Sequence, residues 1–93
     1  MLVAICQVEL SLFESNSLKD KRSIVLSLKE RIRQRFNVSI AEIAELNNLK
    51  VAQFGLAIVS NEKRYLEKIY ANILNLIEDD GRVEIINQIF ELG

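Results

Sequence analysis

The sequence predicts an α+β fold in which four strands and two helices follow one another in the order β-α-β-β-α-β. Three observations support this prediction. Apolar and polar residues alternate near the start of the chain, as in a strand with one buried face. Two later segments repeat apolar residues at helical spacing. The segments that follow these helices are apolar and rich in β-branched residues, which favours strands.

The first strand is predicted over residues 2–12, LVAICQVELSL, because every even position is apolar. Cys6 is one of these even residues, so we expect a small core side chain and not a reactive thiol. The opposite face of the strand holds the odd residues Val3, Ile5, Gln7, Glu9 and Ser11.

The first helix is predicted to follow a polar break at residues 14–17. Ser17 and Asp20 resemble a capping box, with Asp in the position where Glu or Gln is usual. Asn37 is expected to end the helix in the left-handed conformation. Apolar residues recur between these two ends at Leu18, Val25, Leu28, Ile32 and Phe36.

Residues 38–46 and 51–60 are predicted as the second and third strands, joined by a short turn. Asn61 is a suitable N-cap for the second helix, with Glu62 in its first turn, and Gly81 is expected to end it in the left-handed conformation. The fourth strand covers residues 82–92. The acidic run at residues 78–80 favours a solvated turn over a cation site, because no ligand spacing accompanies it.

Right-handed crossovers place both helices on one face of a four-stranded antiparallel sheet. This is the ferredoxin-like βαββαβ two-layer sandwich, and we expect one such domain over residues 1–93. The second face of the sheet is left open. The parity of the third strand is undecided: if its even residues point outward, Phe54, Leu56 and Ile58 join the open face.

Composition excludes several classes of function. The 93 residues include no His and one Cys, which removes Ser-His-Asp and Cys-His catalysis, imidazole metal ligands and an intramolecular disulfide. The third strand holds a single aromatic residue, Phe54, and no basic start, unlike the corresponding strand of RNA-recognition modules, and no glycine-rich loop follows the first strand. We therefore expect no enzyme, no metal and no cofactor. Because the sequence has no basic leader and no long apolar run, we expect a cytoplasmic protein that does not associate with a membrane.

Charge is distributed unevenly along the chain. Residues 17–36 hold seven basic and two acidic side chains, whereas the remaining residues hold five basic and eleven acidic ones. A basic helix with free amides at its N-terminus favours contact with phosphates, from RNA or the ribosome. The alternative is a solvated helix face. The candidate nucleic-acid or phosphate-binding residues are Lys19, Lys21, Arg22, Lys29 and Arg33.

The partly apolar open face of the sheet favours a different class of function. Val3, Ile5 and Gln7 are candidate interface residues, and a homodimer is the simplest partner for such a face. In this alternative the protein is a homo-oligomeric interaction module with no nucleic-acid role. A small-molecule sensor is a third hypothesis, but no glycine or acidic ligand signature follows the first strand.

Four segments resemble the YlxP-like family of small bacterial proteins: residues 7–10 (QVEL), 17–23 (SLKDKRS), 35–42 (RFNVSIAE) and 57–61 (AIVSN). The resemblance implies a ferredoxin-like fold, an unknown function and no established enzymatic activity. Family genes often lie beside those for translation initiation and ribosome maturation factors, which implies a role near the ribosome. Lys19, Lys21, Arg22 and residues 35–37 stand in the matched segments. The loop at residues 46–50 (LNNLK) departs from many members.

Overall fold

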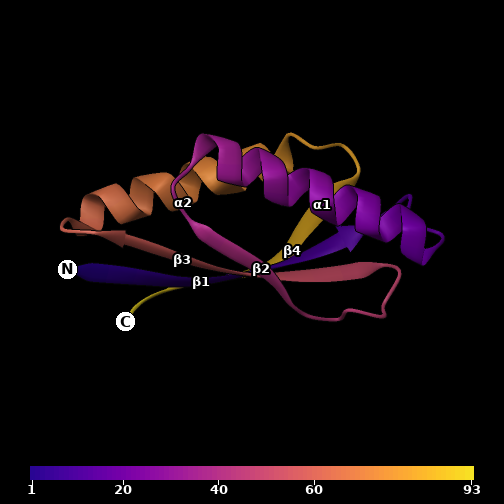
Figure 1. Cartoon of the computed structure of the whole chain (residues 1–93), viewed down its shortest axis with the longest axis horizontal. Coiled ribbons are helices and arrows are strands. Elements are labelled where there is room, and N and C mark those ends of the chain that lie inside the picture. The colour runs from indigo at the N-terminus through magenta and orange to yellow at the C-terminus, as the bar shows by residue number, and fades with distance from the viewer.

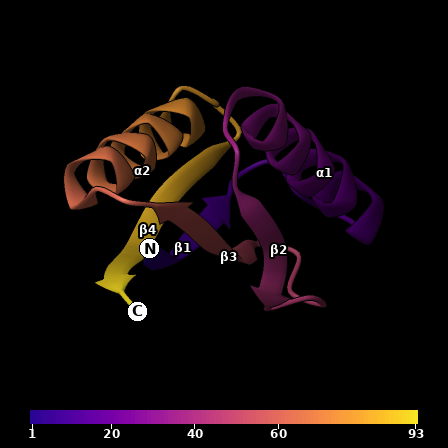
Figure 2. The same ribbon diagram turned by 60° about the vertical axis from the view of Figure 1, so that its left-hand side comes forward.

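The predicted order of elements is confirmed by the computed structural model, which describes residues 1–93. The neighbouring strands are all antiparallel and lie in the order β2-β3-β1-β4. Both helices cover one face of the sheet (Figure 1), with α2 above β4 and α1 on the side of β2 (Figure 2). The predicted ferredoxin-like two-layer sandwich is therefore confirmed. The elements are β1 (Leu2–Leu12), α1 (Leu18–Arg35), β2 (Ser39–Ala44), β3 (Val51–Ser60), α2 (Lys63–Glu78) and β4 (Val83–Leu92).

The register of β1 against β3 decides which side chains form the core. Val8 lies opposite Phe54, and directly paired residues of adjacent strands share a face. Phe54, Leu56 and Ile58 are accordingly buried beneath the helices, so the possibility that they join the open face is wrong. Cys6 is buried among them, as predicted, and burial raises the pKa of its thiol to about 11.

The first helix begins as predicted but ends differently. Ser17 is the N-cap, and its Oγ accepts a hydrogen bond from the Asp20 N–H at 3.0 Å. The Asp20 carboxylate accepts from the Asn16 N–H at 3.1 Å, one residue earlier than in a regular capping box. At the other end Phe36 is already extended, and the expected left-handed Asn37 is wrong. The chain continues directly toward β2, with Phe36 packed against the core.

The second helix differs from the prediction at both ends. Its N-cap is Glu62 and not Asn61, and the Ser60 Oγ accepts a hydrogen bond from the Glu62 N–H at 3.2 Å. Gly81 does not adopt a positive φ, so its expected left-handed conformation is wrong. The Asp80 carboxylate instead accepts from the Arg82 N–H at 3.0 Å, and this side-chain bond turns the chain into β4.

Candidate nucleic-acid interface

One flank of α1 carries the cations that remain available to a partner. Lys19, Arg22, Lys29 and Arg33 recur at helical spacing, and we call these four residues the basic flank. Lys29 is half-buried and the other three are exposed. Arg33 Nη2 donates to the Ile40 carbonyl of β2 at 3.0 Å, so the basic flank lies above the β2 edge of the sheet. A rigid helix thus presents a row of positive charge along one side of the molecule.

None of the four basic-flank residues forms an ion pair. The ion pairs of the chain are Lys21–Glu42 at 3.1 Å, Arg31–Asp80 at 3.1 Å and Arg82–Asp80 at 2.6 Å. A fifth cation adds to the flank near the start of α1, where Lys50 Nζ donates to the Asn16 Oδ1 at 3.1 Å. An un-neutralised row of cations attracts a polyanion more strongly than a set of paired charges does.

Lys21 is the one candidate residue that the structure removes from the interface. Its side chain is 2% exposed, pairs with Glu42 and donates to the Glu45 carbonyl. Glu45 has a φ of 63°, and Lys21 thereby fixes the left-handed residue that opens the β2–β3 loop. Lys21 precedes the buried Ile24, Val25 and Leu28 by three, four and seven positions, so helical spacing already indicates an inward position.

The N-terminus of α1 is also less suited to a phosphate than the sequence suggested. The Asp20 carboxylate lies within its first turn and accepts a backbone N–H there. A negative side chain at this position already interacts with the positive end of the helix dipole and repels an anion. The basic flank, and not the helix N-terminus, is therefore the candidate contact for phosphates.

The acidic run between α2 and β4 contains a structural residue that the sequence did not reveal. Glu78 and Asp79 are exposed, as expected of a solvated turn, but the Asp80 side chain is only 5% exposed. Hydrogen bonds from the Arg82 guanidinium, at 2.6 and 2.9 Å, lower the Asp80 pKa to about 2 against the opposing effect of burial. Arg82 also donates to the Ser27 Oγ of α1 at 3.2 Å. The cluster joins α1 to the start of β4.

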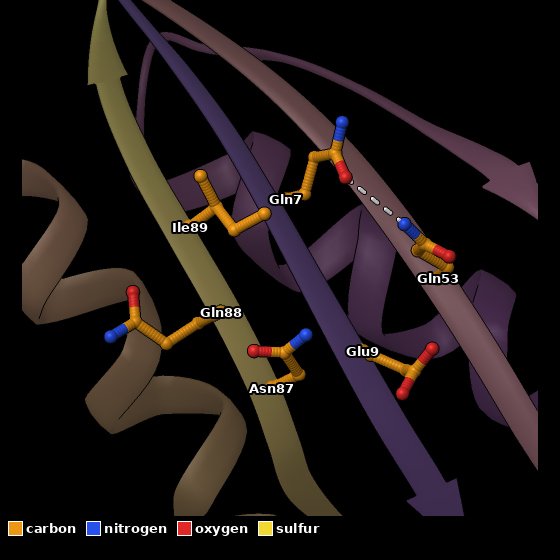
Figure 3. A pocket seen from close by; sticks show the side chains of 6 residues that line it. All are labelled: Gln7, Glu9, Gln53, Asn87, Gln88 and Ile89. Carbon is orange, nitrogen blue, oxygen red and sulfur yellow. Dashed lines mark hydrogen bonds between the residues drawn. The ribbon is translucent and has the colours of Figure 1, made fainter.

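The open sheet face holds the predicted interface residues Val3, Ile5 and Gln7. The Oε1 of Gln7 accepts from the Gln53 Nε2 at 3.1 Å, in the polar patch of Figure 3. Beside this patch lies a shallow apolar depression of about 290 Å³ lined by residues of β1, β2 and β3. Ile43 covers Gly55 there so closely that a Cβ on Gly55 would lie 2.8 Å from the Ile43 Cγ2. The charged side chains in register on this face are Glu9, Glu84 and Glu91.

Two further findings concern sites that other functions would need. No three side chains of Cys, Asp or Glu gather in a way that could hold a metal ion. Neither helix combines the length and the apolar character that crossing a bilayer requires.

Residues 3–89 match the family of proteins of unknown function designated DUF503. The chain belongs to this family. A curated relative is the uncharacterized protein YlxP of Bacillus subtilis (strain 168), which is 29% identical over 83 residues, 89% of this chain and 90% of YlxP. The resemblance to YlxP-like proteins that the sequence motifs indicate is thus confirmed.

Two solved structures resemble the chain in fold alone. The de novo designed protein Foldit4 has a TM-score of 0.60 and 16% identity, over 98% of this chain and 97% of the design. A second design with a ferredoxin fold, LFR1 1, has a TM-score of 0.52 and 14% identity, over 100% of this chain and 84% of that one. The chain therefore has a fold that computational design has also produced, and the fold does not identify a function.

Proposed function

We propose that the protein is a non-enzymatic RNA-binding protein whose basic flank contacts the phosphate backbone of RNA at or near the ribosome. The observation that supports this proposal most directly is the absence of any ion pair at Lys19, Arg22, Lys29 and Arg33. Of the other three cations on α1, Lys21 and Arg31 form ion pairs, whereas Arg35 lies over the ring of Phe36. The ribosome enters through the gene neighbourhood that the resemblance to YlxP-like proteins implies.

The geometry of the basic flank favours contacts to phosphates over contacts to bases. Its four residues lie within a fifteen-residue stretch of α1 whose ends are about 21 Å apart along the helix axis, which matches several successive phosphates of one strand. The neighbouring edge strand β2 carries no aromatic side chain on which a base could stack. Such contacts position RNA without reading its sequence, so binding is expected to be weakly selective and strongly dependent on salt.

The proposal is tested by titrating the protein into fluorescently labelled ribosomal RNA at several salt concentrations. For four phosphate contacts on single-stranded RNA, log K is expected to fall with log salt at a slope of about −3. The variant Arg22→Glu/Lys29→Glu should lose most of the affinity and reduce the slope by about half. Arg33 is left unchanged, because its hydrogen bond to Ile40 joins α1 to β2.

The matched control is Arg64→Glu/Lys68→Glu on α2, which changes the net charge by the same amount at exposed positions of the other helix. We expect this variant to keep the slope of the parent. Equal losses of RNA affinity in the two variants would show that binding follows net charge alone. The basic flank would then not be the interface. A parent protein that does not bind above background would contradict the RNA-binding function itself.

A further inference from the structure

We infer that two copies of this chain pair through the free edges of their β4 strands to form a continuous eight-stranded sheet. β4 is a ten-residue strand at one edge of the sheet, and most of its side chains are exposed. Ile86, Ile89 and Leu92 are 49%, 42% and 41% exposed. Long apolar edge strands pair readily with another chain, and β4 contains neither Lys nor Pro to prevent this.

The backbone of β4 offers a regular set of unpaired groups. The Gly93 N–H donates to the Val3 carbonyl at 2.9 Å, which continues the β4–β1 ladder beyond its last strand residue. Because hydrogen-bonded pairs alternate along antiparallel strands, Ile89 and Glu91 direct their backbone groups to β1. Gln88, Phe90 and Leu92 then direct their N–H and C=O groups to the free edge. These six groups form one side of a further antiparallel ladder.

The opposite edge of the sheet is less suited to a second copy. β2 has only six residues, and its pairing with β3 is interrupted by a bulge at Ile43. Arg33 already occupies the Ile40 carbonyl of this strand. Pairing through β2 would also bring the basic flanks of the two copies together, and like charges would repel. These features favour β4 as the edge that pairs.

A two-fold axis through Ile89 gives a register in which no like charges face each other. Ile89 of one copy packs against Ile89 of the other on the open face of the sheet. Asn87 lies opposite Glu91 of the other copy, so its amide can donate to that carboxylate. In Figure 3, Asn87 and Ile89 both project from β4 onto the open face. The bulge at Ile86 limits the regular ladder to residues 87–91.

The α2 helices of the two copies, which lie above the paired β4 strands, are compatible with this register. The Tyr70 hydroxyl of α2 donates to the Gln88 Oε1 at 2.6 Å, which places Tyr70 level with the centre of the paired strands. Lys63 and Glu78 lie about two helical turns before and after Tyr70 on the same flank of α2. Because the two α2 helices run antiparallel across the two-fold axis, Lys63 of each copy lies level with Glu78 of the other. Opposite charges therefore lie at the same level on both sides of the axis.

The paired molecule would keep both basic flanks accessible. α1 lies on the β2 side of the sheet and α2 above β4 (Figure 2), so the basic flanks stand at opposite ends of the eight-stranded sheet. The inference does not rest on RNA binding, since it follows from the two edges of the sheet and from the helix above β4.

The mass of the protein in solution tests the inference. Light scattering and sedimentation velocity over a concentration series of the full chain should show a monomer that converts to a dimer. Ile89→Lys places two lysines against each other on the axis and should weaken association about 100-fold or more. The matched control is Val59→Lys, the same kind of change at a 54% exposed position of the same sheet face on β3. We expect Val59→Lys to dimerise like the parent.

Hydrogen exchange locates the interface independently of the variants. In the dimer, the amides of Gln88 and Phe90 should exchange more slowly than in the monomer, because each gains a backbone partner. Thermal unfolding of Ile89→Lys verifies that its fold is kept. A chain that stays monomeric at all concentrations overturns the inference. The inference is also overturned if Val59→Lys abolishes the dimer and the amides of Gln88 and Phe90 stay unprotected, because the two copies would then pair through the open sheet face.

Discussion

Replacing Asp80 by Asn is expected to destabilise the protein in a way that depends on pH. In the folded chain the Arg82 guanidinium holds the Asp80 pKa at about 2, below its usual 3.8. Since one pKa unit corresponds to about 1.4 kcal/mol, the ionised side chain contributes about 2 kcal/mol to the free energy of unfolding at neutral pH. For a domain of this size, that loss lowers Tm by about 10 °C.

The sign of the pH dependence follows from the direction of the shift. A carboxyl whose pKa is lowered on folding stabilises the native state fully above its unfolded pKa of 3.8. That contribution is lost as the pH falls from about 4 through about 2, where the folded state also binds the proton. The parent and Asp80→Asn should therefore differ by about 2 kcal/mol at pH 7 and converge near pH 2.

Urea unfolding followed by circular dichroism at pH 7, 4, 3 and 2 measures this difference. Asp79→Asn is the matched control, because Asp79 is the exposed neighbour with the same charge, and it should change stability by less than about 0.5 kcal/mol at every pH. A difference between parent and Asp80→Asn that stays constant from pH 7 to pH 2 would refute the reasoning, since the loss would then not come from the ionised carboxylate.

Three further experiments, two substitutions and one thiol reaction, test the interior and the sheet. Lys21→Met should cost about 3 kcal/mol, because it leaves the Glu42 carboxylate without its buried partner, and the double variant with Glu42→Leu should recover much of this loss in urea unfolding. Gly55→Ala should cost about 1 kcal/mol, because its Cβ meets Ile43, and Ile43→Ala in the same chain should relieve the effect. Cys6 should resist a thiol reagent at pH 8 in the native protein and react once urea unfolds the chain, because burial raises its pKa to about 11.

The alternation in β1 and the helical spacing in α1 and α2 could be interpreted from the sequence because each reflects burial of one face. Residues 2–12 coincide with β1 for this reason. The ends of the helices were less predictable. Asn37 and Gly81 are residue types that left-handed caps prefer, but Phe36 and the Asp80 carboxylate provide other ways to end the helices. Capping preferences are worth little when a core contact or a charged hydrogen bond competes with them.

The structure places the five candidate cations in different surroundings, and their contact with RNA stays a prediction. Of these five cations, Lys19, Arg22 and Lys29 are free of ion pairs and hydrogen bonds, as a binding surface requires. Arg33 is exposed but donates to Ile40. Lys21 is buried, although charge alone had grouped it with the others. The sequence shows that a lysine carries a positive charge, whereas the partner of that charge depends on which strand packs beneath the helix.

The sequence by itself determined the order of the elements, the buried face of β1, the membership in the YlxP-like family and the concentration of positive charge in one helix. These features follow from local periodicity, matched segments and composition. Only the tertiary structure decided which face of β3 is buried, and that Lys21 pairs with Glu42 and Asp80 with Arg31. It also decided that the basic flank lies above one edge of the sheet and that β4 forms the other edge. Each of these depends on residues far apart in the chain, such as Val8 with Phe54 or Arg31 with Asp80, which meet only when the sheet forms.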